Sequence, residues 1–290
     1  MRSFGIAAHR TLRQTEDGGL THWLRSCAPS IRALGLRMCA VGASWDAIEQ
    51  MQLLAGYEGL QRLPYGREGG VMRLASRIAG GLDAADSLDG IFYLLDPLDP
   101  SSLYPEALAL KRQCVIHAKP FVATVAGAIE WVAVEAVLAG APRFGSHLPA
   151  GVLAPEQQTI ALVAHDALKS TMVDFASRHF ELLSRASRRV GTGTTSGRLN
   201  EMAWARGWPR SSLWVEPFRS GPLGGDAQIA ELVLDRRCQK VIFFEDVHVA
   251  RQHEADIQLL ERAVCTATRD ATCFNTPMMA QAWAQAWSPA

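Results

Sequence analysis

Four segments in the second half of the chain combine glycines, hydroxyl groups and ionisable side chains at spacings that suit phosphate binding and acid/base chemistry. The first is Ala164-His165-Asp166-Ala167-Leu168-Lys169, where an apolar run leads into a helical pattern. A histidine at the carboxyl end of a parallel strand and a lysine one turn later both face the crevice where such sheets bind ligands. The alternative is that Asp166 only caps the helix and Lys169 is a solvated surface charge.

The second segment is Gly191-Thr192-Gly193-Thr194-Thr195-Ser196-Gly197. Its glycines allow close approach to the backbone, while consecutive N–H groups and three threonine hydroxyls can surround a phosphate at a helix N-terminus. Dinucleotide binding is a rival, but the third fingerprint glycine and the acidic partner are missing, and there is no P-loop lysine. The segment indicates a phosphate site, with a plain structural turn as the alternative.

The third segment, Ser220-Gly221-Pro222-Leu223-Gly224-Gly225-Asp226, also lies between an apolar run and a helical pattern. The two consecutive glycines remove side chains from the approach to Asp226, which begins the helix. The helix dipole favours an ionised carboxylate there, and such a carboxylate can serve as a general base. Helix capping would explain Asp226 but not the glycine-rich approach.

The fourth segment runs from Glu245 to Asp256 and contains two histidines. His253 and Asp256 are three residues apart at a predicted helix start, so the carboxylate can orient the imidazole. His248, His253 and nearby carboxylates could also bind a divalent metal, but they match no zinc spacing, and we predict neither metal nor cofactor. The absence of a Gly-x-Ser-x-Gly elbow argues against a hydrolase of that kind.

Short apolar runs alternate with segments of helical period along the chain, which is typical of repeated βα units around a parallel sheet. In the second half we predict strands at Thr159–Ala164, Leu213–Val215 and Lys240–Phe244. Helical faces between these strands are formed by Leu168, Met172, Phe175, His179 and Leu182, and by Ile229, Leu232 and Val233.

An internal repeat relates the two halves of the chain. Three matches recur in the same order: Gly5-Ile6-Ala7-Ala8-His9 with Leu162-Val163-Ala164-His165, Pro64–Gly70 with Pro217–Gly225 after a small shift, and Gly90–Tyr93 with Val241–Phe244. The chain is therefore predicted to be α/β, with two tandem doubly wound parallel-sheet domains.

The length and composition of the chain agree with two domains. A chain of 290 residues fits two domains of ordinary size, which we place at 1–140 and 155–290, and the breaker-rich stretch Ala139–Gln158 between them is expected to be a linker. The net charge of zero gives no field to attract nucleic acid, and no apolar run approaches the roughly 20 residues needed to cross a bilayer. With no CxxC pair and no signal-peptide pattern, we expect a cytoplasmic protein.

At the four motifs the second half, from about Thr159 to Trp287, resembles methylglyoxal synthase. The motifs that carry the resemblance are Val163-Ala164-His165-Asp166 with Lys169, Thr192-Gly193-Thr194-Thr195, Ser220–Asp226 and His253-Glu254-Ala255-Asp256-Ile257. The resemblance implies domains of methylglyoxal synthase-like type and a carbon–oxygen lyase that converts dihydroxyacetone phosphate to methylglyoxal and phosphate without a cofactor.

The resemblance also implies a role for each site residue. Asp226 would remove a proton from the carbon beside the carbonyl, His253 would polarise the carbonyl oxygen or move protons between oxygens, and Asp256 would hold His253 in place. The implied substrate-binding residues are His165, Asp166, Lys169, Thr192, Gly193, Thr194, Thr195, Ser220 and Gly221. Ser196 and Glu245 depart from the family's pattern.

The first half departs further. His9 is kept, but Arg10 replaces the aspartate, Val71 falls at or beside the base position, and Leu103 falls near the second histidine. Ala40-Val41-Gly42-Ala43-Ser44 has lost most hydroxyls of the phosphate loop. Because valine cannot accept a proton, we expect a catalytically inactive domain that acts as a scaffold.

The resemblance also implies a homo-oligomer, because typical members of the family are homohexamers. Three two-domain chains would then take the place of six single-domain subunits. The alternative function is a non-catalytic regulatory module that senses a phosphorylated ligand. Retention of Asp226, His253 and Asp256 together favours the enzyme, because sensing a phosphate requires none of them. A third hypothesis is that the protein is a structural partner of another enzyme, and only the altered first half favours it.

Overall fold

A computed structural model describes residues 2–141, 155–246 and 254–288, and the side chains of all these except 254–257. The chain divides into two compact units, Met1–Leu148 and Pro149–Ala290. Most of the predicted linker Ala139–Gln158 lies outside the described residues. Within the described part, no helix has both the length and the apolar character needed to span a membrane.

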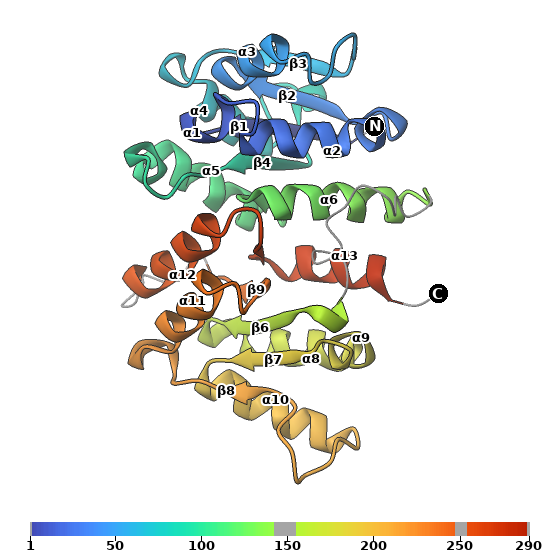
Figure 1. Cartoon of the computed structure of the whole chain (residues 1–290), viewed down its shortest axis with the longest axis vertical. Helices are drawn as coiled ribbons and strands as arrows, with labels where there is room; N and C mark the ends of the chain where they lie inside the picture. Colours follow the sequence, from blue (N-terminus) through green and yellow to red (C-terminus); the bar gives the residue numbers. More distant parts are fainter. Residues whose placement is uncertain (1, 142–154, 247–253, 289–290) are drawn as a thin grey trace. The chain divides into compact units, whose positions relative to one another are not determined.

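The first unit is built on a five-stranded parallel sheet in the order β3-β2-β1-β4-β5 (Figure 1). Its strands are β1 (Ser3–Ala8), β2 (Arg37–Val41), β3 (Leu60–Leu63), β4 (Gly90–Leu94) and β5 (Phe121–Val122). The two central strands, β1 and β4, are buried along their whole length, as expected for a sheet covered on both faces.

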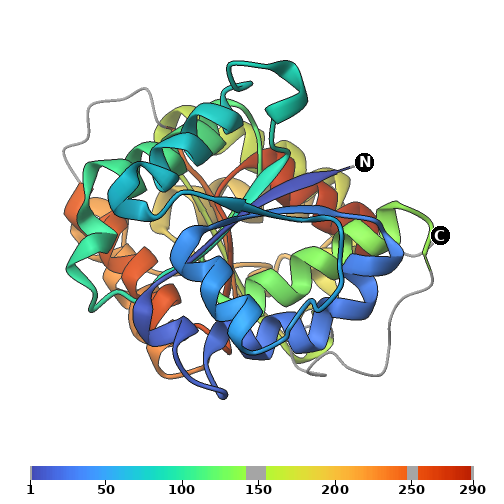
Figure 2. The same ribbon diagram turned by 90° about the horizontal axis from the view of Figure 1, so that it is seen from above.

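Helices cover both faces of this sheet (Figure 2). On one face α2 packs against α6, and on the other α4 packs against α5. The helices of the first unit are α1 (Arg10–Arg13), α2 (Gly19–Ala33), α3 (Gly42–Gln50), α4 (Gly70–Ile78), α5 (Pro105–Ile116) and α6 (Val125–Leu138). Three 3₁₀ turns accompany them: η1 (Gly66–Glu68), η2 (Ala84–Asp86) and η3 (Pro100–Leu103).

The second unit has the same topology, with a five-stranded parallel sheet in the order β10-β9-β6-β7-β8. Its strands are β6 (Thr159–Ala164), β7 (Arg188–Gly191), β8 (Glu216–Pro217), β9 (Lys240–Phe244) and β10 (Thr272–Phe274). In each unit the first strand, β1 or β6, lies at the centre of the sheet and pairs with the second and fourth strands of that unit. The predicted fold class, a tandem pair of doubly wound parallel sheets, is confirmed.

The helices of the second unit repeat the arrangement of the first. On one face α8 packs against α10 and α13, and on the other α11 packs against α12. These helices are α8 (Lys169–Arg178), α9 (Phe180–Ser184), α10 (Gly193–Ala205), α11 (Gly225–Leu234), α12 (Glu254–Thr266) and α13 (Pro277–Trp287). The described 3₁₀ turns are η4 (Pro155–Gln157), η5 (Asp166–Leu168) and η6 (Gly221–Leu223).

The predicted strand Leu213–Val215 is wrong, because β8 begins only at Glu216, the residue after Val215. Trp214 and Val215 are buried, as their apolar character suggests, but their backbone is satisfied by a side chain. The Asn200 amide oxygen accepts from the N–H groups of Trp214 and Val215, and its nitrogen donates to the Val215 carbonyl. Asn200 therefore takes the place of a neighbouring strand at these residues.

The helical face predicted from Leu168 to Leu182 is interrupted. Leu168 belongs to the turn η5, and α8 ends before His179, whose Nε2 lies 3.0 Å from Oε1 of Gln281. Met172, Phe175 and Leu182 are nevertheless buried, as the pattern predicts. The predicted apolar face is thus divided between α8, which carries Met172 and Phe175, and α9, which carries Leu182.

The structure locates the shift in one repeat match and corrects the register of another. Gly69 and Gly224 are the left-handed residues of equivalent turns, with φ of 87° and 94°, so Pro64 corresponds to Arg219 and not to Pro217. The β4 strand matches β9 with Leu94 over Phe244, because the histidine after the first strand bonds to that carbonyl in each unit. The shift in the Pro64–Gly70 match is thus two residues at its start, with Gly70 over Gly225, and the match of Gly90–Tyr93 with Val241–Phe244 is wrong by one residue.

Candidate active site of the second unit

His165 directly follows the central strand β6, and two contacts fix its ring. The backbone N–H of Asp246 donates to Nδ1 at 2.8 Å, and the ring meets Phe243 edge-on with centroids 5.0 Å apart. Because Nδ1 accepts a hydrogen bond, the neutral ring carries its proton on Nε2. His165 is therefore held as a hydrogen-bond donor at the carboxyl end of the sheet.

The threonine loop joins the end of β7 to the start of α10. Thr192 and Thr195 are buried, whereas Thr194 is exposed. The Thr195 hydroxyl has no hydrogen-bond partner among the described residues. Ser196 is also fully buried, and its Oγ would lie 2.8 Å from a Cβ added to Gly191, so this departure from the family pattern packs against the end of the strand.

Backbone contacts bring the threonine loop beside the glycine-rich loop. The Gly193 N–H donates to the Arg219 carbonyl at 3.1 Å, and the Phe218 N–H donates to the Gly191 carbonyl at 2.8 Å. A Cβ added to Gly193 would lie 3.2 Å from the Ser220 nitrogen, which is tighter than ordinary contact. The glycine thus allows two loops that are far apart in sequence to meet.

The glycine-rich loop folds back on itself before α11. Gly224 has a left-handed φ of 94°, and the Gly225 N–H donates to the Ser220 carbonyl at 3.0 Å. A Cβ on Gly225 would lie only 2.0 Å from the Arg219 carbonyl oxygen. The paired glycines are therefore required by the path of the chain.

Asp226 is the second residue of α11 and is 7% exposed. Its Oδ2 atom would lie 2.9 Å from a Cβ added to Gly221, so the carboxylate rests against the bare backbone of the loop. The N-terminus of a helix stabilises the ionised form of such a group. The loop that carries Ser220 and Gly221 therefore also positions a buried carboxylate.

Lys169 and Asp166 form an ion pair at the start of α8. The Lys169 side chain is 14% exposed and that of Asp166 is 94% exposed, so the carboxylate lies on the solvent side of the ammonium group. The hydrogen bond from Lys169, followed by its charge, lowers the pKa of Asp166. The mostly buried lysine is therefore paired with a carboxylate that is itself exposed.

Two predicted catalytic residues cannot be placed. His253 lies outside the described residues, and Asp256 belongs to α12 but its side chain is outside the described part. Within the described residues, no group of three or more histidine, cysteine, aspartate or glutamate side chains is arranged to hold a metal ion. The sequence reasoning missed Asp246, whose N–H fixes His165; its position just after β9 was the available signal.

The first unit contains a matching set of backbone positions. The Asp96 N–H donates to Nδ1 of His9 at 2.9 Å, and the His9 ring meets Tyr93 edge-on, as His165 meets Phe243. Gly70, like Gly225, has no room for a Cβ, which would lie 2.2 Å from the Pro64 carbonyl oxygen. Val71 follows Gly70 as Asp226 follows Gly225, so it occupies the backbone position of the carboxylate. Leu103, the predicted counterpart of His253, ends η3 and is 54% exposed.

Comparison with known proteins gives consistent relatives. The chain is 39% identical over 122 residues to a methylglyoxal synthase of Agrobacterium fabrum, covering 42% of this chain and 84% of that relative. It is 42% identical over 108 residues to a methylglyoxal synthase of Thermus thermophilus, covering 37% and 78%. A crystal structure of methylglyoxal synthase from Elizabethkingia anophelis matches with 36% identity and a TM-score of 0.31, covering 36% of this chain and 66% of that one. No family model matches the chain.

Proposed function

The chain belongs to the methylglyoxal synthase family, and we propose that its second unit converts dihydroxyacetone phosphate to methylglyoxal and inorganic phosphate. The observation that carries this proposal is the position of Asp226. It is a buried carboxylate at a helix N-terminus, against a glycine backbone and beside a loop rich in hydroxyl groups.

The proposed reaction begins with transfer of a proton from the hydroxymethyl carbon of the substrate to the Asp226 carboxylate. The electron pair left behind forms an enediolate with the neighbouring carbonyl, whose oxygen becomes negative. Donors aimed at that oxygen lower the barrier because they interact more strongly with the transition state than with the ground state. The Nε2–H of His165 is one such donor, since Nδ1 is fixed as an acceptor by Asp246.

The second step breaks the carbon–oxygen bond to phosphate. The hydroxyl on the former hydroxymethyl carbon passes its proton to the negative enediolate oxygen and becomes an aldehyde. The double bond shifts, and the electron pair of the broken bond leaves with phosphate. The enol product then takes up a proton on its terminal carbon and releases its hydroxyl proton to give methylglyoxal. No oxidant or reductant is consumed, and the reaction is a lyase elimination.

Phosphate binding is assigned to Lys169, Thr192, Gly193, Thr194, Thr195, Ser220 and Gly221. The buried Thr195 hydroxyl, which has no partner among the described residues, supports this assignment because a phosphate oxygen would satisfy it. Lys169 would exchange the exposed Asp166 for the phosphate. His253 and Asp256 join the site on the strength of the family resemblance, as the groups that move protons between the substrate oxygens.

The experiment that tests the proposal is a direct assay for methylglyoxal release from dihydroxyacetone phosphate by the purified full chain. We expect Asp226→Asn to lower kcat by at least about 10³-fold, because the general base is lost. Inorganic phosphate should still bind to this variant. The matched control is Asp235→Asn, at the exposed C-terminal end of the same helix, which should leave turnover unchanged.

Full turnover in Asp226→Asn would refute the mechanism. Absence of methylglyoxal from the wild-type chain, with saturable binding of a phosphorylated ligand, would instead favour the regulatory module. We further propose that three chains assemble so that their six units take the subunit positions of a hexamer. Sedimentation equilibrium tests this, and a monomer at micromolar concentration would exclude it.

A further inference from the structure

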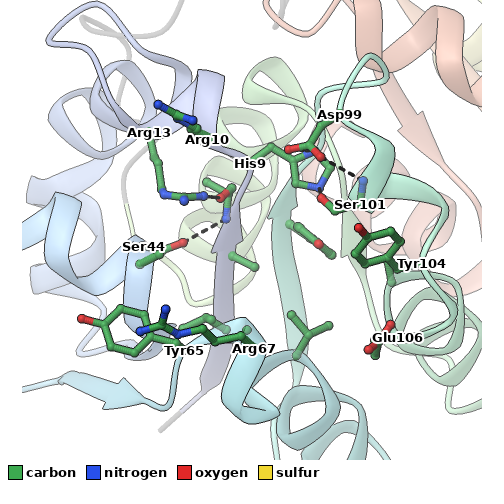
Figure 3. A pocket seen from close by; sticks show the side chains of 18 residues that line it. His9, Arg10, Arg13, Ser44, Tyr65, Arg67, Asp99, Ser101, Tyr104 and Glu106 are labelled. Carbon is green, nitrogen blue, oxygen red and sulfur yellow. Dashed lines mark hydrogen bonds and ion pairs between the residues drawn. The ribbon is translucent and has the colours of Figure 1, made fainter.

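The first unit contains a cavity at the carboxyl ends of its strands, in the place that corresponds to the proposed active site of the second unit (Figure 3). Its volume is about 620 Å³, which is within the range of roughly 300–1,000 Å³ for small-molecule sites. Its floor is apolar and includes Ala7, Val41 and Val71. A cavity of this size and position requires an explanation that a scaffold role does not supply.

The cavity keeps the anion-binding groups of the second unit in kind. Arg13 follows His9 by four residues, as Lys169 follows His165, so a cation stands at the same place after the central strand. Ser44 replaces Thr195, and its Oγ accepts a hydrogen bond from the Ala8 N–H at 3.0 Å. Both Arg13 and Ser44 line the cavity. What this unit lacks is the base, since valine occupies that position.

The balance of charge around the cation is different in this unit. In the second unit Asp166 pairs with Lys169, whereas the corresponding residue here is Arg10, which adds a second positive charge. Arg67 lines the cavity from the glycine-rich turn and lies over the Tyr65 ring, 5.4 Å from its centroid. Three arginines therefore line one cavity, although the Arg10 Nε donates to Gln14 Oε1, and guanidinium is well suited to phosphate.

The opposite side of the cavity has the opposite character. Figure 3 shows Arg13 and Ser44 on one side, and Asp99, Tyr104 and Glu106 on the other. Carboxylates accept hydrogen bonds from hydroxyl and amino groups, and the Tyr104 ring offers an apolar face. A ligand that fits both sides carries an anion at one end and hydrogen-bond donors at the other.

We propose that the first unit binds a phosphorylated small molecule larger than a triose phosphate, and that it does so without chemistry. The phosphate lies at Arg13 and Ser44, with Arg10 and Arg67 nearby, and the body of the ligand extends over the apolar floor. Sugar hydroxyls or a base amino group face Asp99 and Glu106. The site is thus a ligand sensor built from the frame of a catalytic site.

His9 contributes a ring to this cavity that is held at both nitrogens. Its Nδ1 lies 2.9 Å from the Asp96 N and 3.2 Å from the Asp96 carbonyl oxygen, and its Nε2 lies 3.2 Å from the Ser101 Oγ. Both His9 and Ser101 line the cavity. The histidine that the two units share is therefore retained here as a binding and positioning group, with no carboxylate at position 71 to act with it.

The test is isothermal titration calorimetry of the full chain with two probes, adenosine 5′-monophosphate and glucose 6-phosphate. We expect at least one of them to bind with Kd below about 1 mM, which is an ordinary metabolite affinity. The decisive comparison is between the matched variants Arg13→Met and Lys169→Met. Binding should weaken at least tenfold in Arg13→Met and change less than twofold in Lys169→Met.

Two further variants guard against misfolding. Arg67→Met removes an exposed cation of the cavity and should weaken binding about threefold to tenfold, whereas Arg25→Met, at an exposed position of α2, should have no effect. Each variant is checked for an unchanged Tm. The dephosphorylated probes, adenosine and glucose, should bind at least tenfold more weakly than their phosphates.

Three results would overturn the proposal: neither probe binds, binding depends on Lys169 and not on Arg13, or the dephosphorylated probes bind as tightly. The measurement is one of binding and not of turnover. Failure of this proposal therefore leaves the lyase assignment of the second unit intact, and failure of the lyase assay leaves this one intact.

Discussion

Gly221→Ala is expected to reduce catalysis without loss of stability. The backbone at Gly221 is not left-handed, so alanine is tolerated there, but its Cβ would lie 2.9 Å from Oδ2 of Asp226. Ordinary contact begins near 3.4 Å, and the carboxylate must therefore move by about 0.5 Å. A displacement of ~1 Å at a catalytic group can cost about 10²-fold in rate.

From half that displacement we expect about a tenfold loss of kcat/KM, or about 1.4 kcal/mol in the activation barrier. The assay is methylglyoxal release from dihydroxyacetone phosphate, with Tm measured alongside. The first unit supplies the control: Gly66 begins the equivalent turn, and nothing lies within 4 Å of a Cβ added there. Gly66→Ala should retain wild-type activity. If Gly221→Ala is as active as Gly66→Ala, the carboxylate does not work from the position described.

Two further predictions concern stability. Asn200→Ala should lower the free energy of unfolding by about 3 kcal/mol, because the buried polar groups of Trp214 and Val215 lose their partner; urea denaturation measures this, and a loss below about 1 kcal/mol would contradict it. Burial lowers the pKa of His9 below its ordinary 6.5, so the unfolded chain takes up a proton that the folded chain refuses, and stability falls as pH drops below about 6.5. His9→Asn should show a smaller fall between about pH 6.5 and about pH 5 in the same denaturation experiment, and an unchanged fall would show that His9 is not its source.

The strands and loops of the second unit could be read from the sequence where local pattern and tertiary environment agree. Thr159–Ala164 and Lys240–Phe244 are apolar runs buried on both faces, and both predictions have the observed bounds. Leu213–Val215 is equally apolar but is not a strand, because Asn200 satisfies its backbone from a distant helix. A side chain fourteen residues away in sequence leaves no trace in the local pattern.

Prediction of the candidate site rests on glycines and hydroxyls in short contiguous motifs, and the structure brings the threonine loop and the glycine-rich loop together. The cavity of the first unit could not be predicted in this way. Its two sides come from segments near Arg13 and near Tyr104, which only the pairing of β1 with β4 brings together. From the sequence, valine at position 71 indicates only that the base is lost, which predicts a scaffold. The gain of Arg10 and Arg67 is visible as a site only when the fold gathers the three cations around one space.

The crossing of backbone at Gly70 and Gly225 bears on how activity is inferred for other chains of this kind. In each unit a carbonyl oxygen occupies the space where a Cβ would be, at 2.2 Å and 2.0 Å, and this holds whether the next residue is Val71 or Asp226. The paired glycines are therefore required for this turn to form. Their presence in a sequence indicates the fold and does not indicate catalytic activity. On the two proposals made above, the residue immediately after the second glycine, Asp226 or Val71, is what separates the catalytic unit from the binding unit.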